Sequence, residues 1–263
     1  MTMPALPVTS SLAARLSGLP RLVLLDVDGT LAPIAPTPHE AVVPDETLRL
    51  VSELAARPDV HVAIVSGRAA GDARRLVDVS GVWFIGNHGF EVVAPSGEFI
   101  VDDRVAPFLG RMTQAAARLA PLGQSVRGLF VEDKRFTLSV HYRLVDRGAV
   151  PAIRRAVEDV AHDLELRTID GKELIEVRPP LDVDKGTAVV ALADSLGALG
   201  AGASVLYAGD DRTDEDAFRA LRRASPRAVT IRVGDDGAGT AAEYSLRDPA
   251  DTRELLAWLV ASA

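Results

Sequence analysis

The sequence predicts an α/β protein with a doubly wound, parallel-sheet, Rossmann-like core and an inserted α+β domain. In the first and last thirds of the 263-residue chain, short aliphatic runs alternate with helical segments. This alternation is typical of parallel sheets covered by helices on both faces. Within residues 104–179 the order becomes helix, strand, strand, repeated once, which favours a small antiparallel sheet with two helices on one face. We therefore expect core segments at 1–103 and 180–263 around an inserted domain at 104–179.

The first core segment opens on four consecutive aliphatic residues at 22–25. Such a run indicates a strand buried on both faces, although a short apolar run also fits a buried helix. A helix begins near Pro44, a residue suited to a first helical turn, and carries an apolar stripe to Ala55. The remaining expected elements of this segment are strands at 60–65 and 82–85 and a helix that ends near residue 76.

The inserted domain and the second core segment follow the two patterns described above. In the inserted domain we expect helices at about 103–119 and 150–162 and strands at 126–131, 136–142, 164–169 and 174–177. In the second core segment we expect a helix at 185–199, strands at 204–208 and 228–233, and a last helix from about 251. A further helix starts at residues 213–216, whose Thr-Asp-Glu-Asp order resembles a capping box.

Composition excludes several classes of function. With a net charge of −8, the chain lacks the basic surface that binds a nucleic-acid backbone, so we expect no nucleic-acid partner. The absence of cysteine excludes disulfides and thiolate metal sites and suits a reducing compartment. Residues 1–20 lack the pattern of a secretory signal, and no apolar run approaches the roughly 18 to 20 residues of a membrane span. We therefore expect a cytoplasmic protein with no membrane partner.

Four polar groups follow expected strands or open expected helices at the carboxyl edge of the core sheet. They are Asp26 with Asp28, Ser66-Gly67-Arg68, Lys185, and Asp210 with Asp211 and Asp214. Each alone has an ordinary structural explanation, such as a turn or a helix cap. Together they lie where ligands of doubly wound sheets bind. Three carboxylates there form an oxygen site suited to Mg²⁺, and Lys185, Ser66 and backbone amides can bind a phosphoryl group, so the pattern indicates phosphoryl transfer.

These groups match, in order, the motifs of the haloacid dehalogenase superfamily of aspartate-nucleophile phosphatases. The chain resembles that superfamily at Asp26-Val27-Asp28-Gly29-Thr30, Ser66, Lys185 and Gly209-Asp210-Asp211 with Asp214. The resemblance implies a hydrolase core in which Asp26 attacks phosphorus and Asp28 is the general acid and base. It also implies that Lys185 offsets charge on the phosphoryl group. Mg²⁺ would be bound by Asp26, Asp210 and the carbonyl of Asp28, while Asp211 and Asp214 support the metal or the lysine.

A closer resemblance, to the trehalose-6-phosphate phosphatase family, extends over residues 22–259. It is carried by residues 28–34, 66–68, 86–89, 141–143, 176–179, 185–186 and 209–215. It implies that the inserted domain is a cap that binds sugar hydroxyls. The substrate-binding residues that it implies are Thr30, Ser66, Gly67, Arg68 and Asn87 in the core and Glu132, Lys134 and Glu176 in the cap. Without the resemblance, the alternation of Glu132 and Lys134 along a strand favours a surface ion pair over substrate contact.

The resemblance implies Mg²⁺-dependent hydrolysis of a phosphorylated disaccharide, trehalose 6-phosphate, by a monomer with a functional link to trehalose-6-phosphate synthase. One alternative keeps the chemistry and changes the sugar, as in phosphatases of sucrose 6-phosphate or mannosyl-3-phosphoglycerate or in phosphomannomutase. Another is a catalytically silent sugar-phosphate-binding domain that regulates a partner. The complete set of Asp26, Asp28, Lys185 and Asp210 argues against silence, because binding alone needs no nucleophile.

Overall fold

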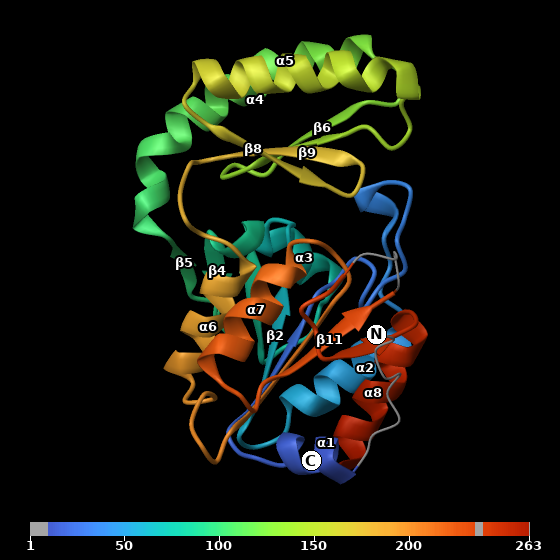
Figure 1. Ribbon diagram of the computed structural model, residues 1–263, viewed down its shortest axis with the longest axis vertical. Coiled ribbons are helices and arrows are strands. Elements are labelled where there is room, and N and C mark those ends of the chain that lie inside the picture. The colour runs from blue at the N-terminus through green and yellow to red at the C-terminus, as the bar shows by residue number, and fades with distance from the viewer. Residues whose placement is uncertain (1–9, 235–238, 263) are drawn as a thin grey trace. The chain divides into compact units, whose positions relative to one another are not determined.

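A computed structural model describes residues 10–234 and 239–262. Residues 1–9, on which part of the expectation about a leader rests, lie outside the described residues. The chain divides into two compact units, which are described separately below (Figure 1). The core unit comprises Met1–Ile100 and Val183–Ala263, and the inserted unit comprises Val101–Asp182.

The core unit is built on an eight-stranded sheet with the order β12-β11-β10-β1-β2-β3-β4-β5. Its strands are β1 (Arg21–Leu25), β2 (Val60–Val65), β3 (Val82–Gly86), β4 (Glu91–Val93), β5 (Phe99–Val101), β10 (Ser204–Gly209), β11 (Val229–Val233) and β12 (Tyr244–Leu246). β1 pairs in parallel with both β10 and β2. The expected parallel sheet is thus confirmed, and β4 adds an antiparallel neighbour to β3.

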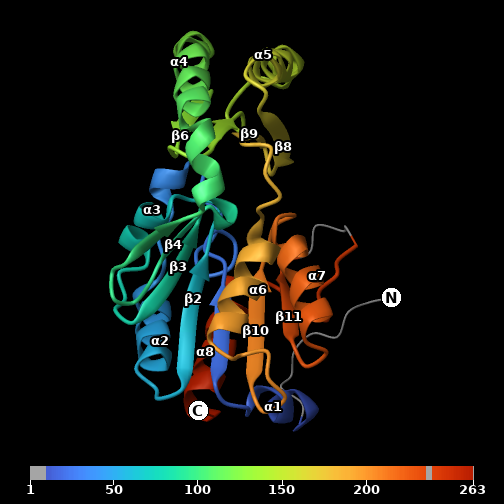
Figure 2. The same cartoon turned by 90° about the vertical axis from the view of Figure 1, so that its left-hand side faces the viewer.

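Helices cover both faces of this sheet. They are α1 (Ser10–Leu16), α2 (Asp45–Ala55), α3 (Ala70–Leu76), α6 (Lys185–Ser195), α7 (Asp214–Ala224) and α8 (Pro249–Ser262). Val23 and Leu25 pack into the cluster formed with α1, α2, α3 and α8, whereas Leu22 and Leu24 pack into the cluster formed with α6 and α7. Alternate residues of β1 are thus buried on opposite faces, which excludes the buried-helix alternative. Figure 2 shows α6 and α7 side by side over β10.

The inserted unit is a four-stranded antiparallel sheet of order β6-β7-β9-β8 with two helices on one face. Its elements are α4 (Leu109–Ser125), β6 (Phe130–Asp133), β7 (Leu138–His141), α5 (Val150–Asp163), β8 (Arg167–Gly171) and β9 (Leu174–Arg178). Leu138, Val140, Ile175 and Val177 face the helices in one apolar cluster. The alternate residues therefore face the other side of the sheet.

Several local predictions are wrong in detail. The helix expected to end at residue 119 continues through Pro121 to Ser125, and the strand expected at 126–131 begins only at Phe130 because Gly128 (φ +85°) turns the chain. Thr213 makes no side-chain cap hydrogen bond, since its backbone is already helical (φ −70°, ψ −21°). The short elements α1, β4, β5 and β12 were not predicted from the sequence.

Candidate active site

Three neighbouring strands end in the polar residues that the sequence singles out. Asp26 follows β1, Ser66 follows β2, and Asp210 follows β10. The register pairs Leu25 with both Ala208 and Ile64, so the three strands end at one level. The Asp26 amide donates a hydrogen bond to the Ala208 carbonyl (3.0 Å) and continues this pairing past the strand. The structure thus brings these groups together at the carboxyl edge of the sheet.

Lys185 is the first residue of α6, and its ammonium lies between two buried carboxylates. Nζ donates to Asp26 Oδ1 at 2.7 Å and to Asp214 Oδ1 at 2.8 Å. Lys185 and Asp26 have exposed fractions of only 2% and 5%, and Asp214 is fully buried. A buried charge is stabilised only if it is paired and hydrogen-bonded, so these three groups form one electrostatic unit.

The pKa values of Lys185 and Asp26 follow from their burial and from the charges around them. Burial alone would lower the pKa of Lys185, but the carboxylates of Asp214 and Asp26 outweigh it and raise that pKa well above its usual value. The side chain is therefore a cation. Burial raises the pKa of Asp26, and the Asp214 and Asp210 charges raise it further, while the Lys185 charge lowers it. The ionisation of Asp26 therefore depends on positive charge being supplied nearby.

The close approach of α6 and α7 is what allows Lys185 to reach Asp214. Gly186, the second residue of α6, lies so near α7 that a Cβ there would come within 2.5 Å of the Asp216 carbonyl oxygen and 3.0 Å of the Ala220 Cβ. Only glycine fits this contact without a shift of one helix. The same end of α6 is fixed by Asp184, which caps the helix through a reciprocal pair of bonds with Thr187.

Asp214 uses both of its oxygens for hydrogen bonds from the protein. Oδ1 accepts from Lys185 and from the Tyr207 hydroxyl (2.6 Å), and Oδ2 accepts from the Asp211 amide (2.8 Å). Burial, and then the Asp214 charge, raise the pKa of Tyr207 well above its usual value, so its hydroxyl is a donor. Asp214 is therefore better placed to orient Lys185 than to give an oxygen to a metal.

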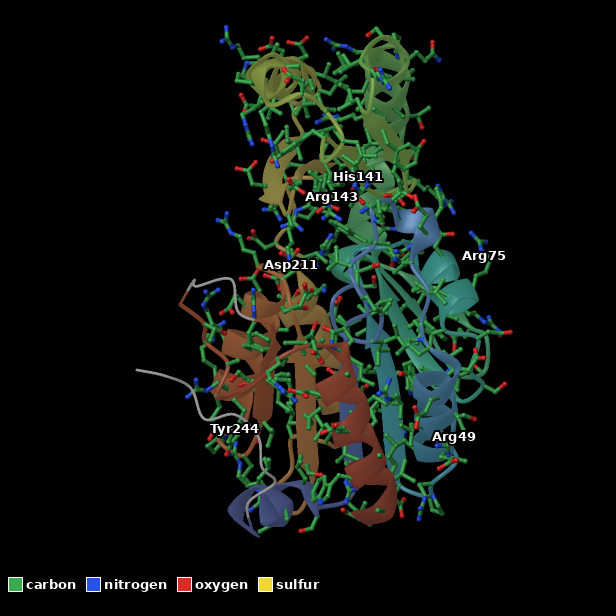
Figure 3. All side chains as sticks on the ribbon, turned by 90° about the vertical axis from the view of Figure 1, so that its right-hand side faces the viewer. Arg49, Arg75, His141, Arg143, Asp211 and Tyr244 are labelled. Atoms are coloured by element: carbon green, nitrogen blue, oxygen red, sulfur yellow. The ribbon has the colours of Figure 1, made fainter. Side chains whose placement is uncertain are left out.

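Three buried carboxylates could nevertheless coordinate one cation. Asp26, Asp210 and Asp214 each offer one oxygen, and these oxygens lie within 4.8 Å of one another. Gly29 (φ +91°) passes so close to Asp210 that a Cβ would lie 2.2 Å from its Oδ2. This all-oxygen set fits Mg²⁺. Asp28 and Asp211 contribute no side-chain oxygen to the cluster; Asp211 lies just beyond β10 (Figure 3) and accepts from the Arg212 amide.

Asp28 is bound on both oxygens by Arg68. The Arg68 Nε donates to Oδ2 at 2.7 Å, and Nη2 donates to Oδ1 at 2.6 Å. Such a bidentate pair is among the stronger charge-assisted contacts. The Asp28 side chain is 36% exposed, unlike that of Asp26, so solvent and a ligand can reach it. Arg68 was expected to contact a substrate, and in this structure it contacts the expected acid and base.

The other core residues expected at the site are Thr30, Ser66, Gly67 and Asn87. The Ser66 hydroxyl accepts from the Arg68 amide (3.1 Å), and the Ser66 carbonyl accepts from the His88 amide (3.2 Å). A Cβ on Gly67 would meet the His88 ring at 2.5 Å. Asn87 is buried and directs its side-chain amide to Glu91, while Thr30 is fully buried and its hydroxyl has no hydrogen-bond partner among the described residues.

In the inserted unit the expected sugar-binding residues lie on one face of the sheet, opposite the helices. The register places Glu132, Ser139 and Glu176 side by side on three adjacent strands. Lys134 donates to Glu176 Oε1 at 3.1 Å, with exposed side-chain fractions of 5% and 4%. Lys134 is therefore a buried group that pairs with Glu176 and not an exposed surface charge. Glu132 contacts His141 Nε2 at 2.8 Å.

Sequence reasoning missed Tyr207 and the function of Gly186, and it assigned no role to His141. Tyr207 sits in an apolar run and reads as core, and its contact with Asp214 depends on how α7 packs. The period-two alternation of β7 could have indicated His141, because Ser139 and His141 alternate with buried Leu138 and Val140. No comparable local signal exists for the Tyr207 hydroxyl.

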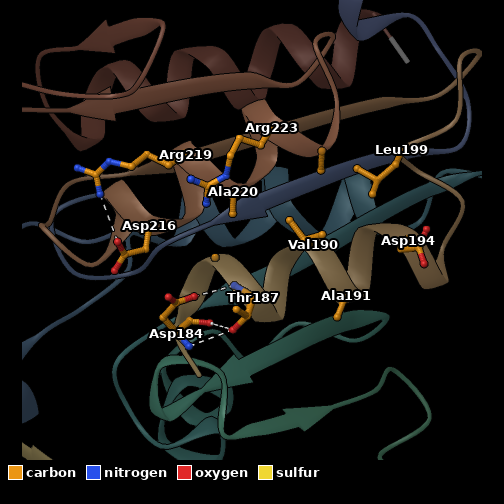
Figure 4. Close-up of a pocket in the computed structure, with 12 residues that line it drawn as sticks. Asp184, Thr187, Val190, Ala191, Asp194, Leu199, Asp216, Arg219, Ala220 and Arg223 are labelled. Carbon is orange, nitrogen blue, oxygen red and sulfur yellow. Dashed lines mark hydrogen bonds and ion pairs between the residues drawn. The ribbon is translucent and has the colours of Figure 1, made fainter. Parts of the chain in front are cut away.

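A groove also runs between α6 and α7 (Figure 4). Its lining includes Asp184, Thr187, Asp194, Arg219 and Arg223, and Figure 4 shows the pairs Asp184–Thr187 and Asp216–Arg219 along it. Its lining residues include none of Asp26, Lys185 and Asp214. The groove therefore does not coincide with the charged cluster that Asp26, Lys185 and Asp214 form.

Comparisons with known proteins identify relatives. The family model described as trehalose-phosphatase matches residues 24–250. A trehalose-phosphate phosphatase of Mycobacterium avium is 40% identical over 243 residues, covering 91% of this chain and 62% of its own length. An uncharacterized glycosyl hydrolase of Mycobacterium tuberculosis is 36% identical over 97% of this chain but only 19% of its own. The chain thus spans less than two thirds of the length of these curated relatives.

Solved structures agree with the sequence comparisons. A trehalose-6-phosphate phosphatase related protein superposes with a TM-score of 0.80 at 28% identity, covering 91% of this chain and 97% of that one. The C-terminal domain of the Candida albicans trehalose-6-phosphate phosphatase gives 0.82 at 24% identity over 99% and 98%, which supports the fold. Within the described residues, no helix is long and apolar enough to cross a membrane. With the family model matching residues 24–250, the chain belongs to the trehalose-phosphatase family.

Proposed function

We propose that this chain hydrolyses trehalose 6-phosphate to trehalose and phosphate through an aspartyl phosphate formed on Asp26. The observation that carries the proposal is the Lys185 ammonium between Asp26 Oδ1 and Asp214 Oδ1. A cation beside a buried carboxylate favours its ionised, attacking form and offsets charge on the phosphoryl group. Membership of the trehalose-phosphatase family supports trehalose 6-phosphate as the substrate.

In the first step an Asp26 oxygen attacks phosphorus and the bond from phosphorus to the sugar oxygen breaks. Asp28 gives the leaving oxygen its proton. In the second step Asp28 takes a proton from a water that attacks phosphorus, and the bond from phosphorus to the Asp26 oxygen breaks, which releases phosphate and restores the Asp26 carboxylate. Arg68 donates to both Asp28 oxygens and so orients the carboxyl group, and each oxygen keeps a second lone pair that can carry the proton. Ser66 and backbone amides at the same sheet edge bind the phosphoryl oxygens.

Asp26, Asp210 and the Asp28 carbonyl would hold Mg²⁺, and Asp214 and Asp211 would support Lys185 and the loop after β10. When bound, Mg²⁺ would offset the negative charge on the transferring phosphoryl group. Core residues Thr30, Gly67 and Asn87 shape the phosphate end of the site. The protein acts as a monomer, and a trehalose-6-phosphate synthase supplies its substrate.

The inserted unit, at residues 104–179, acts as a cap. It recognises the sugar through Glu132, Lys134 and Glu176. Burial of Lys134 and Glu176 together on a polar sheet face supports this assignment, because such a pair costs desolvation energy that a purely structural sheet can avoid. Hydrogen bonds from charged groups to hydroxyls contribute about 1.5–3 kcal/mol each.

The test compares trehalose 6-phosphate with a small aryl phosphate. Glu132→Gln should lower kcat/KM for the disaccharide roughly tenfold to a hundredfold and leave the aryl phosphate almost unchanged. Lys134→Met and Glu176→Gln should show the same selectivity, with melting temperatures measured because each removes one charge of a buried ion pair. Glu158→Gln, a change on the exposed side of α5, is the matched control. Equal losses on both substrates would contradict the assignment.

A further inference from the structure

Tyr207 is a buried tyrosine whose hydroxyl contacts Asp214, the partner of Lys185. It lies on β10 and is fully buried. Its ring meets Phe218 of α7 edge to face, with centroids 5.6 Å apart and planes at 82°. That packing fixes the direction of the hydroxyl, since a tyrosine has only two side-chain torsions. The hydroxyl donates to Asp214 Oδ1 at 2.6 Å.

Three donors fix the orientation of the Asp214 carboxylate. Two of them, the Tyr207 hydroxyl and the Lys185 ammonium, share Oδ1, and the Asp211 amide takes Oδ2. Without the Tyr207 hydroxyl, Lys185 would be the remaining donor to Oδ1. Lys185 is itself the group that Asp214 has to position. The carboxylate and the ammonium could then shift together relative to Asp26. With the hydroxyl in place, Asp214 is a fixed point from which Lys185 reaches Asp26.

We propose that Tyr207 is a positioning residue for the reaction: its hydroxyl fixes Asp214, and Asp214 in turn holds the Lys185 ammonium on Asp26 Oδ1. No motif of the sequence marks this role. The kinetic part of the inference rests on the proposed function, whereas the structural part, the placement of Lys185, does not. The competing explanation is that Tyr207 only fills space beside Phe218 and that its hydroxyl needs a partner of some kind.

Tyr207→Phe separates the two explanations, because it keeps the ring and its contact with Phe218 and removes one oxygen. The matched control is Tyr244→Phe, which removes the hydroxyl that accepts from Arg15 (3.3 Å) on β12, at the far edge of the sheet. Because a misplacement of about 1 Å can cost about a hundredfold in rate, we expect kcat for a small aryl phosphate to fall roughly tenfold to a hundredfold in Tyr207→Phe. Tyr244→Phe should keep the wild-type kcat.

A second readout needs no substrate. The chain has only three lysines, Lys134, Lys172 and Lys185, so labelling the lysine Nζ with nitrogen-15 gives three assignable ammonium signals. The Lys185 signal, identified by its loss in Lys185→Arg, should shift and exchange with water at least about tenfold faster in Tyr207→Phe, because its counterion has lost an anchor. Lys134, buried beside Glu176 in the inserted unit, is an internal control and should not change.

The inference is supported if the Lys185 signal changes in Tyr207→Phe and not in Tyr244→Phe, and if kcat falls with it. An unchanged Lys185 signal together with wild-type kcat would overturn it, as would equal effects in the two variants. If the Lys185 signal changes but no phosphate ester is hydrolysed by the wild type, the proposed function fails and the positioning role stands. Should Tyr207→Phe not fold, the wild-type hydroxyl proton of Tyr207 should still be a slowly exchanging resonance close in space to Lys185, and its absence overturns the inference.

Discussion

Replacing Gly186 with alanine tests whether the contact of α6 with α7 determines the position of Lys185 relative to Asp26 and Asp214. The added Cβ would lie 2.5 Å from the Asp216 carbonyl oxygen and 2.8 Å from its carbon, and these are backbone atoms that cannot rotate away. Ordinary van der Waals contact begins near 3.4 Å, so the helices must separate by roughly 1 Å at this point. The adjacent residue is Lys185, whose hydrogen bonds to Asp26 and Asp214 are 2.7 and 2.8 Å long.

Two magnitudes follow from that displacement. Overpacking costs about 1–3 kcal/mol of the free energy of unfolding, which for a domain of this size lowers the melting temperature by about 2–4 °C per kcal/mol. A shift of about 1 Å at a catalytic group costs about a hundredfold in rate. We therefore expect Gly186→Ala to lower kcat for an aryl phosphate about a hundredfold and the melting temperature by several degrees.

The matched control is Gly71→Ala in α3, in the same unit, where an added Cβ meets nothing within 4 Å. Alanine is favoured over glycine inside a helix by about 0.5–1 kcal/mol, so Gly71→Ala should be neutral or slightly stabilising and fully active. The assays are differential scanning calorimetry and phosphate release. If Gly186→Ala matched Gly71→Ala in both, the close helix contact would not be what positions Lys185.

Two further predictions concern metal and pH. Exhaustive treatment with EDTA should lower activity at least about a hundredfold and added Mg²⁺ should restore it, because a bound cation contributes several kcal/mol to charge stabilisation; full activity after chelation would contradict the assigned site. The second concerns Glu243, whose pKa lies below its usual value of 4.5, chiefly because of its hydrogen bond with Arg15. Since the pKa is lower in the folded state, the stabilisation is complete above about pH 4.5 and is lost as the pH falls through the folded value. The melting temperature of Glu243→Gln should thus lie below that of wild type at neutral pH, by the equivalent of at most about 1 kcal/mol, and converge with it in acid; a constant difference would refute the pairing.

The sequence was sufficient to predict the parallel core and the meeting of Asp26, Ser66 and Asp210. The physical reason is that parallel strands run in the same direction, so residues that directly follow them share an edge whatever the intervening chain does. Lys185 could be included because it opens a helix at the same edge. The inserted antiparallel sheet was predictable because each helix there is followed by two strands, an order typical of an antiparallel sheet with helices on one face.

Features that depend on packing between helices could not be predicted. Tyr207 lies in a run of buried residues, and only the placement of α7 shows that its hydroxyl reaches Asp214. The partners of Glu132 and Lys134 depend on strand register, which places Glu176 two strands away from Glu132. The contact of Arg68 with Asp28 joins residues 40 positions apart, and the sequence offers no signal for it.

We propose above that Asp26 is the nucleophile that attacks trehalose 6-phosphate. The most direct measurement is phosphate release from trehalose 6-phosphate and sucrose 6-phosphate by the wild-type chain and by Asp26→Asn, which keeps the shape of the side chain and removes its charge. We expect the wild type to prefer trehalose 6-phosphate and Asp26→Asn to lose activity by at least about a thousandfold while remaining folded. Activity of Asp26→Asn above about a tenth of wild type, or a wild-type preference for sucrose 6-phosphate, would contradict the account.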